Sequence, residues 1–496
     1  MGETGDAALP KVAAIRVARP GRRRLARYGS NIYWLETAPP RPPARRLEGR
    51  ARYDVVIVGG GFTGLWTAYH LLSEEPGLRV ALLEREEIGY GASGRNGGFS
   101  MTLLDMSLHH LVRNNGVEAA RAVHEAAAKA VQLMADTVRR EGIECELDYG
   151  GLLTVATNEA QERKIARDLA AAESIGAADI RPLTGEEVRA RVNSPTYRMG
   201  FEEDHCAVLH PAKLVRGLAD VAERRGLDIF EFVEVRALVP AAGGVRVVTE
   251  QGDVEAGQVV LALSAWAAHS SEFERDLAPV YTYVILTEPI PDELWKEVGW
   301  EGRQGIEDKR VHIHFTRRTR DGRILWGGRE NIQTYGGDIG PHHDADDRVF
   351  HLLRGTFART FPQLARVRFT HAWGGPVDIT PTFMPVFGST AGGRIHYGHG
   401  YCGHGVGPSH LGGQILTDLA LRRWTERTEL CFVNAPRGRW PREPARFIGG
   451  YLTRRESLWF DEAQEVGKGR HDEPRLLQLA TKLFAPRFTR PKGRTG

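Results

Sequence analysis

DVVIVGGGFTGLWTAYHLLSEEPGLRVALLE, residues 54–84, is the stretch of sequence that decides the fold. Its first five residues are typical of a buried parallel strand, and the glycine-rich turn after them leads into an apolar helix. A second strand follows and ends in Glu84. We expect Gly59 to permit the tight turn, Gly61 to let the backbone approach a pyrophosphate, and Gly64 to let helix and strand pack closely. The order of strand, turn, helix, strand and acid predicts a dinucleotide-binding unit.

The residues around this turn also indicate how the dinucleotide is held. Phe62 and Thr63 belong to this turn, and the helix is expected from Leu65 to Leu72. Its N-terminus offers unpaired N–H groups and a positive dipole to the phosphates. Glu84 is placed to accept hydrogen bonds from the hydroxyls of an adenosine ribose. A glutamate rather than an arginine at this position argues against a ribose 2′-phosphate, so NADP is disfavoured.

Length and composition limit the class of protein. A chain of 496 residues is too long for one compact core, so we expect two or three domains. The formal net charge of +3 gives no reason to expect nucleic acid or an anionic membrane as a partner. No apolar run approaches the roughly 18 residues that span a bilayer. The N-terminus lacks a secretory signal, and the four cysteines have no CxxC spacing, so we expect a cytoplasmic protein.

Helix and strand patterns alternate along the chain in a way that suggests its division into domains. Parallel βαβ patterns occur in separate segments, with helical and antiparallel patterns between them. We therefore predict an α/β chain, α+β overall, in which a Rossmann-type cofactor domain of discontinuous segments carries an inserted antiparallel-sheet substrate domain. The predicted parts are a basic Pro/Arg-rich arm (1–50), the cofactor domain (51–110, 200–272 and 372–425), a substrate or cap domain (111–199 and 273–371), and a C-terminal tail with a terminal helix (426–496).

Two further glycine-rich motifs carry a family resemblance. Residues 88–98 read IGYGASGRNGG, and residues 397–406 read YGHGYCGHGV. Together with the first motif they resemble the FAD-dependent D-amino-acid-oxidase-like family, which includes glycine oxidase and monomeric sarcosine oxidase. The segments GASGRNGG and GYxGHGV are similar to those of its gamma-glutamylputrescine oxidoreductase branch. The resemblance runs from about residue 52 to about residue 450. It identifies the family but gives little information about the substrate.

The resemblance implies FAD as the cofactor and suggests which residues contact it. Small residues in 89–98 would let backbone amides lie against FAD, and Arg95 would meet a phosphate or a flavin carbonyl unless it forms a salt bridge. Residues 403–406 would direct a helix N-terminus at the flavin, where negative charge develops on reduction. The expected FAD-binding residues are Gly59, Gly61, Phe62, Thr63, Gly64, Glu84, Arg85, Ser93, Gly94, Arg95, Asn96, Gly97, Gly98, Val235, Ala262, Ser264, Gly403, His404, Gly405 and Val406.

The resemblance also implies oxidation of a C–N bond in an amine or amino acid. Hydride would pass from the substrate to flavin N5, and the resulting imine would hydrolyse, with no general base required from the sequence. We expect Arg317 to hold a substrate carboxylate, because a guanidinium group matches it bidentately. We expect His314, on the same face of that strand, to assist, although a surface position for His314 is the alternative. Oxygen or another electron acceptor would complete the reaction, and the sequence does not separate these two cases or indicate an oligomeric state.

Departures from the family pattern limit what is carried over. Sarcosine-oxidase-like members place a substrate-contacting lysine where this chain has Gly407, so a sarcosine-like binding mode is doubtful. Residues 372–388 contain no cysteine, whereas some relatives attach their flavin through one there, so we expect non-covalent FAD. His399, Cys402 and His404 could alternatively bind a metal, but they lack a second pair of ligands and we expect none.

Two other functions stay open at this point. A flavoprotein of another reaction class, such as an aromatic hydroxylase, would share the first motif, but the later acidic motif of that class is not found. A flavin-containing protein that modifies nucleic acid has only the Arg-rich ends of the chain in its favour.

Overall fold

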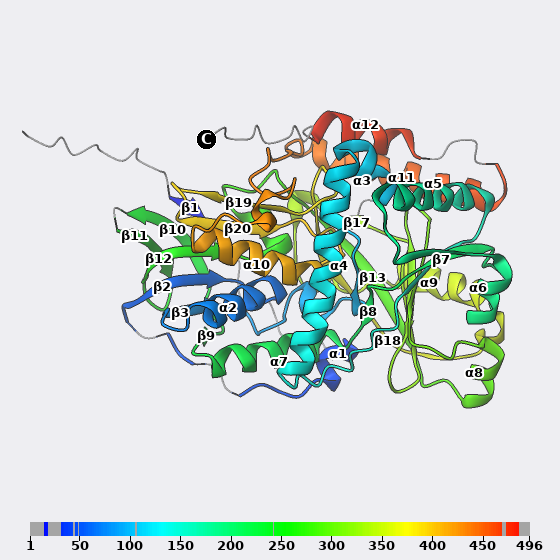
Figure 1. Ribbon diagram of the computed structural model, residues 1–496, viewed down its shortest axis with the longest axis horizontal. Helices are drawn as coiled ribbons and strands as arrows, with labels where there is room; N and C mark the ends of the chain where they lie inside the picture. Colours follow the sequence, from blue (N-terminus) through cyan, green and yellow to red (C-terminus); the bar gives the residue numbers. More distant parts are fainter. Residues whose placement is uncertain are drawn as a thin grey trace, which may run out of the picture.

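A computed structural model of the chain describes residues 14–17, 31–42, 45–47, 49–104, 107–241, 243–468 and 473–485. Two large mixed sheets, each of nine strands, are its main elements, and helices cover them. In Figure 1 the first sheet lies on the left, the second on the right, and the long helix α4 (Val117–Arg140) runs between them. The α/β fold class expected from the sequence is confirmed.

The first sheet contains the strand and glycine turn that open the dinucleotide-binding unit. Its central strands are parallel, and they are nearly continuous runs of apolar residues because both faces are buried, one under helices and the other under a second apolar core. Helix α2 (Phe62–Glu74) packs between α7 (Pro211–Arg224) and α10 (Pro408–Ala420) on the helix-covered face. The strands are β1 (Ile15–Arg16), β2 (Ala51–Val58), β3 (Val80–Leu83), β9 (Asp228–Phe230), β10 (Val235–Ala241), β11 (Gly244–Thr249), β12 (Val254–Leu261), β19 (Val386–Thr390) and β20 (Ile395–His399).

The second sheet is mainly antiparallel, with one parallel pair between β5 and β14. One of its faces is covered by a core that includes Trp326, Leu353 and Phe357, the last two from α9 (Asp347–Thr360). The strands are β5 (Leu152–Ala156), β6 (Ile180–Leu183), β7 (Met199–Glu203), β13 (Ala278–Thr287), β14 (Gly305–Asp308), β15 (His314–Arg318), β16 (Ile324–Gly328), β17 (Ile332–Gln333) and β18 (Phe369–Ile379).

The remaining elements join and flank the two sheets. β4 (Phe99–Ser100) and β8 (Ala207–Val208) form a short antiparallel pair. They lie where the chain leaves the first sheet for the second and where it returns. Helices α11 and α12 come last and lie near α3 and α5 at the top of Figure 1. The helices not yet named are α1 (Tyr33–Thr37), α3 (Leu108–Asn115), α5 (Glu159–Ile175), α6 (Gly185–Arg191), α8 (Asp292–Val298), α11 (Ala445–Glu465) and α12 (Arg475–Phe484), with short 3-10 helices at Ala92–Gly94, Ser264–His269, Tyr335–Gly337, Pro341–His343, Pro362–Leu364 and Glu426–Glu429.

The expected N-terminal arm (1–50) contains two short elements that pack on the rest of the protein. Strand β1 pairs with β10, and helix α1 buries Trp34 completely, at 0% exposure. Apolar residues scattered in a Pro/Arg-rich segment gave no periodic signal, so the packing of these short pieces could not be predicted. Residues 1–13 and 18–30 of the expected arm, and 486–496 of the expected tail, lie outside the described residues.

Two expected domain boundaries also differ from the structure. Strand β18 pairs along β13, so residues 372–379 belong to the second sheet rather than to the cofactor domain. Strand β7 pairs with β5, which moves residues 200–203 to the second sheet as well. A strand pattern in the sequence identifies the strand but not its partner, which explains both differences.

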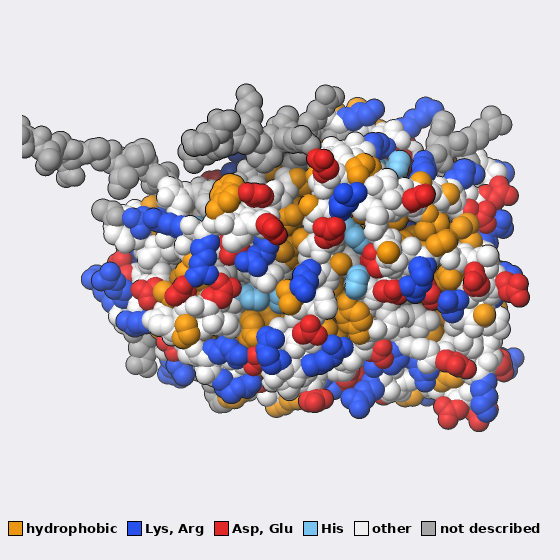
Figure 2. All heavy atoms as spheres, viewed as in Figure 1, with side chains coloured by type: hydrophobic (Ala, Val, Ile, Leu, Met, Phe, Trp, Pro, Cys, Tyr) orange, Lys and Arg blue, Asp and Glu red, His pale blue; other side chains and the backbone are white. Residues whose placement is uncertain are grey.

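The surface is mixed in charge. Figure 2 shows Lys and Arg side chains interspersed with Asp and Glu on the face drawn, as expected for a net charge of +3. Within the described ranges, none of the helices is both long and apolar enough to pass through a membrane.

Candidate active site

A cavity of about 1420 Å³ lies between the two sheets. This volume exceeds the roughly 300–1,000 Å³ of pockets for one small molecule, so a dinucleotide and a substrate can share it. Seventeen of the twenty expected FAD-binding residues line it, and the exceptions are three glycines. The seventeen are Gly59, Gly61, Phe62, Thr63, Glu84, Arg85, Ser93, Arg95, Asn96, Gly97, Val235, Ala262, Ser264, Gly403, His404, Gly405 and Val406.

The first glycine turn has no room for side chains. Gly59 has a φ of +114°, and a Cβ there would lie 2.3 Å from the carbonyl oxygen of Ala262. A Cβ on Gly64 would lie 2.1 Å from the carbonyl oxygen of Gly59. Gly61 precedes the first turn of α2 and lines the cavity, so the helix N-terminus faces the space where phosphates would bind.

Glu84 lies at the end of β3 and lines the cavity. Its Oε2 accepts a hydrogen bond from the Gly60 N–H at 2.6 Å, and its Oε1 accepts one from the Glu86 N–H at 2.9 Å. Burial raises the pKa of the carboxyl group. These bonds fix the carboxylate at the edge of the cavity.

Two tryptophans hold the second glycine segment, Trp34 from outside the cavity and Trp373 from its lining. Trp34 Nε1 donates a hydrogen bond to the carbonyl oxygen of Asn96 at 2.9 Å, and Trp373 Nε1 donates one to that of Arg95 at 2.8 Å. The side-chain oxygen of Asn96 accepts a bond from the Gly98 N–H at 2.7 Å. The loop that would lie against FAD is therefore fixed partly by α1, an element that the sequence did not predict.

Gly94 and Gly98, which were expected to contact FAD, do not line the cavity. A Cβ on Gly94 would lie 2.2 Å from the carbonyl oxygen of Gly89, and one on Gly98 would lie 2.2 Å from that of Leu209. Both are therefore glycines because neighbouring backbone packs against them. Gly64, which also lies off the cavity, has the helix-packing role expected for it.

Arg95 forms a salt bridge and also lines the cavity. Its Nη1 donates to Asp344 Oδ1 at 2.9 Å and to the carbonyl oxygen of Gly374 at 3.0 Å. The salt bridge left open as an alternative is thus present, and it connects the glycine segment to the loop before α9. Cys402 also lines the cavity, and its thiol donates to the carbonyl oxygen of Gly400 at 3.3 Å.

The late glycine loop, residues 400–407, approaches the same cavity from the end of β20. Asp378 Oδ2 accepts a hydrogen bond from the Gly400 N–H at 2.6 Å and holds the start of this loop. Burial raises the pKa of Asp378 to about 6. Helix α10 begins directly after the loop, at Pro408, so its N-terminus lies at the cavity as expected.

Arg317 and His314 do not line the cavity, so their expected contact with substrate stays a prediction that this geometry does not support. Arg317 is fully buried, and its Nη1 donates to the carbonyl oxygens of Gly98 and Leu209. His314 pairs with Asp308 at 3.1 Å. The two residues are three positions apart on β15, so they point to opposite faces of the strand rather than to one.

Several cavity residues with polar side chains were missed, among them Glu307, Lys309, His312 and Arg329. Glu307 lies on β14, and the other three follow β14, precede β15 or follow β16. The sequence did contain a sign of these residues, in the charged side chains of the short strand at 305–308. Buried charges in a strand are rare outside functional sites. Helix α12 also lines the cavity, through Leu477 and neighbouring residues.

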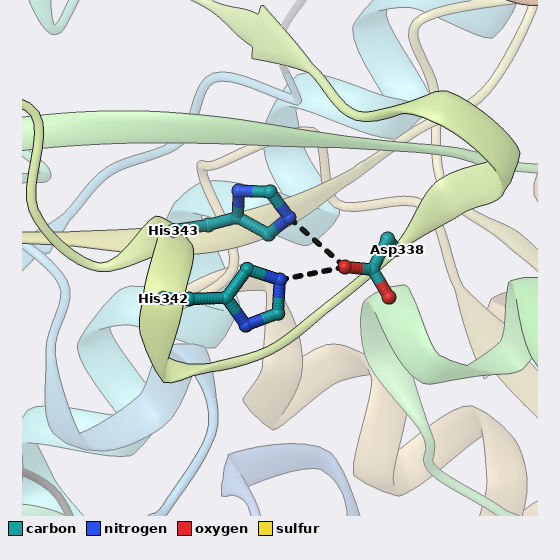
Figure 3. Close-up of side chains that lie close together, drawn as sticks. All are labelled: Asp338, His342 and His343. Carbon is teal, nitrogen blue, oxygen red and sulfur yellow. Dashed lines mark hydrogen bonds and ion pairs between the residues drawn. The ribbon is translucent and has the colours of Figure 1, made fainter. Parts of the chain in front are cut away.

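His399, Cys402 and His404 do not converge as metal ligands in the part of the chain that is described. Groups that do converge there are His124 with Asp179 and Glu203, and Asp338 with His342 and His343. Figure 3 shows both imidazoles of the second group directed at Asp338, with Nε2–Oδ2 distances of 2.7 Å for His342 and 3.1 Å for His343. This second group lies off the cavity lining.

A parallel sheet with a glycine-rich turn at the end of its first strand, facing a second sheet across one cavity, is typical of enzymes that bind a dinucleotide. Residues 54–419 match the family model "FAD dependent oxidoreductase". The chain therefore belongs to this family, and FAD is its cofactor. The glycine-cradled cavity fits a molecule of that kind.

Similar proteins agree with this assignment. The chain is 31% identical to gamma-glutamylputrescine oxidoreductase of Escherichia coli (strain K12) over 437 residues, which cover 86% of this chain and 99% of the relative. The fold is similar to glycine oxidase from Geobacillus kaustophilus, with a TM-score of 0.64, 22% identity and coverage of 76% and 96% of the two chains. It is also similar to L-proline dehydrogenase from P. horikoshii, with a TM-score of 0.65, 19% identity and coverage of 82% and 99%.

Proposed function

We propose that the protein oxidises the C–N bond of a small amine or amino acid, giving an imine that hydrolyses in water. The observation that carries this proposal is one cavity lined by residues of all three glycine-rich motifs and of the second sheet. FAD bound along the glycine corner would supply the two-electron acceptor. Gene products named for C–N substrates, such as gamma-glutamylputrescine oxidoreductase and glycine oxidase, support the substrate class.

The chain's own residues would bind FAD, and they would orient and enclose the substrate. Gly59, Gly61 and the start of α2 would hold the pyrophosphate, and Glu84 the adenosine ribose. The loop of residues 403–406 and the N-terminus of α10 would stabilise negative charge that develops during reduction. Residues of the second sheet would place the substrate and exclude water, which strengthens electrostatic interactions within the cavity.

We propose non-covalent FAD and a cytoplasmic protein that transfers electrons to oxygen or another acceptor. Cys402 is the cysteine that lines the cavity among the described residues, and its thiol is engaged with a backbone carbonyl. The four cysteines are free thiols, which supports a reducing compartment. Acid precipitation should release all the flavin into the supernatant, and flavin retained in the pellet would contradict the non-covalent assignment.

The test of the proposed function is an anaerobic screen. The yellow protein is mixed with a panel of primary amines, secondary amines and amino acids, and the flavin absorbance is followed. Bleaching by one class of C–N compound is the expected result, and recolouring with peroxide on admitting air would identify an oxidase. Failure of every C–N compound to bleach FAD-loaded protein would refute the proposal.

A further inference from the structure

One row of residues crosses the face of the second sheet that is turned toward the cavity. Strand pairing places Val284, Gly327, Phe315, Glu307 and Thr154 side by side on β13, β16, β15, β14 and β5. Residues paired across neighbouring strands point to the same face. Val284, Phe315 and Glu307 all line the cavity, so this is the face that meets the substrate space.

Phe315 fixes the position of this row relative to the FAD-binding segment. A Cβ on Gly97 would lie 2.9 Å from Cε2 of Phe315, which places the two residues in contact. Glu307 is the register partner of Phe315 and therefore lies one strand, about 5 Å, farther along the same face. The carboxylate is thus next to the point where the second sheet touches the glycine segment.

Glu307 is a buried carboxyl group with few partners. It is 5% exposed, and within the described residues the hydrogen bond to its carboxylate comes from Thr154 Oγ1, at a long 3.4 Å. Burial raises its pKa. A buried acid in a ligand cavity that is poorly satisfied by its own protein is a candidate for contact with the ligand.

The charged groups around Glu307 do not neutralise it directly. Lys309, directly after β14, is paired with Asp168 of α5 at 2.9 Å. His404 of the late glycine loop is the other group whose charge would stabilise the carboxylate. The titratable groups that face Glu307 from the surrounding elements are Asp308 of β14, Lys309 directly after it, Glu203 of β7, Asp168 of α5, Cys206 before β8, and His404.

We propose that the Glu307 carboxylate accepts a proton from the substrate ammonium group before the C–H bond is broken. This inference rests on the proposed function, because it requires an amine substrate. In the step an N–H bond breaks, an O–H bond forms on Glu307, and the electron pair stays on nitrogen. That lone pair then forms the C=N bond when hydride leaves the α carbon for the FAD that the family binds.

The transfer has a large effect on rate, because most of an amine is protonated near neutral pH. An aliphatic ammonium with a pKa of about 10.4 is uncharged in only about one molecule per thousand at pH 7.5. A positioned base that removes the proton inside the cavity contributes typically about 10²–10⁴-fold. We therefore expect Glu307→Gln to lower kcat/KM by about 100- to 1,000-fold at pH 7.5.

The experiment measures anaerobic flavin reduction against pH, using FAD-loaded wild-type protein and the best amine from the screen. For wild-type protein, kcat/KM should rise with pH to a plateau reached well below the pKa of the amine. For Glu307→Gln it should rise tenfold per pH unit up to the pKa of the amine, so that high pH restores the rate. A Glu307→Gln profile that overlies the wild-type profile overturns the proposal.

Controls separate a chemical role from a structural one. Glu203→Gln removes a neighbouring buried carboxylate of the same sheet, outside the lining of the large cavity, and should keep the plateau even if the loss of this nearby charge shifts the pH at which the plateau begins. Glu307→Asp should keep the plateau at a lower rate. Each variant must show the visible spectrum of bound FAD. If Glu307→Gln fails to fold, the wild-type profile decides: a continuous rise to the pKa of the amine overturns the proposal.

A binding measurement gives a second readout without turnover. The α,α-dimethyl analogue of the best amine has no α C–H and cannot be oxidised, so its affinity can be titrated by perturbation of the flavin spectrum. For wild-type protein, its Kd should not change with pH near neutrality. For Glu307→Gln, its Kd should fall as the pH rises. Equal dependence in both proteins contradicts a role for Glu307. If no amine reduces wild-type protein, the proposed function fails first and the role of Glu307 is overturned with it.

Discussion

Replacement of Gly64 by alanine should loosen FAD binding, because this glycine sets how closely α2 approaches β2. A Cβ at this position would lie 2.1 Å from the carbonyl oxygen of Gly59 and 3.2 Å from Cγ2 of Ile57. Ordinary contact begins at 3.4 Å, so the helix and the glycine corner must separate by about 1.3 Å. Overpacking of this kind costs about 1–3 kcal/mol.

The bound state needs the compact corner, so that cost falls on FAD binding. A loss of about 2 kcal/mol corresponds to a roughly 30-fold increase in Kd. We therefore expect Gly64→Ala to be purified with little flavin and to require excess FAD for colour. The measurement is a titration of stripped protein with FAD, followed by quenching of flavin fluorescence, together with thermal unfolding of the stripped protein.

A matched control lies in the same unit. Gly77, in the turn between α2 and β3, has no atom within 4 Å of its Cβ position, so Gly77→Ala should bind FAD like wild-type protein. The reasoning is refuted if Gly64→Ala and Gly77→Ala bind FAD equally well and unfold at the same temperature. Because both variants make the same chemical change, a difference between them reports the packing at the corner alone.

Three further substitutions test other parts of the site. Trp34→Phe removes the N–H that bonds to the Asn96 carbonyl, worth about 1 kcal/mol, and should weaken FAD binding about fivefold in the same titration. Burial raises the pKa of Asp378 from its usual 3.8 to about 6, so between pH 3.8 and pH 6 the folded protein binds more protons than the unfolded protein. The free energy of unfolding therefore falls as the pH rises from 3.8 to 6. In stripped protein, urea unfolding of Asp378→Asn should lack this dependence, a difference on the order of 3 kcal/mol; parallel curves would contradict the assignment. Arg317→Met should lower the melting temperature, because the buried carbonyls of Leu209 and Gly98 each lose a hydrogen bond and, among the described residues, only that of Gly98 keeps another, from the Leu209 N–H, while KM changes by less than about twofold; a large rise in KM would return Arg317 to the substrate site.

The cofactor side of the site could be predicted because its constraints are local in sequence. Gly59, Gly61 and Gly64 each exclude a side chain for a reason tied to one turn between a strand and a helix. Gly94 and Gly98 have the same appearance in the sequence, but the backbone they contact comes from Gly89 and from the distant Leu209. Sequence spacing therefore indicated the loop but not which glycines face the cavity.

The substrate side could not be predicted in the same way, because it depends on which strands pair. Arg317 was chosen for its chemistry, yet its guanidinium group extends along the sheet to backbone carbonyls beside the cavity. Glu307 faces the cavity only because β14 pairs with β15 on one side and with β5 on the other. The contribution of Trp34 likewise depends on a contact between residues 62 positions apart.

The central claim is that the glycine corner of β2 and the late loop after β20 hold one FAD between them. A diffraction structure of the protein with FAD bound tests it most directly. We expect the pyrophosphate at the N-terminus of α2, the adenosine ribose at Glu84, and the flavin ring between residues 403–406 and the face that carries Phe315 and Glu307. Electron density for FAD elsewhere, or a flavin ring away from the second sheet, would contradict the account.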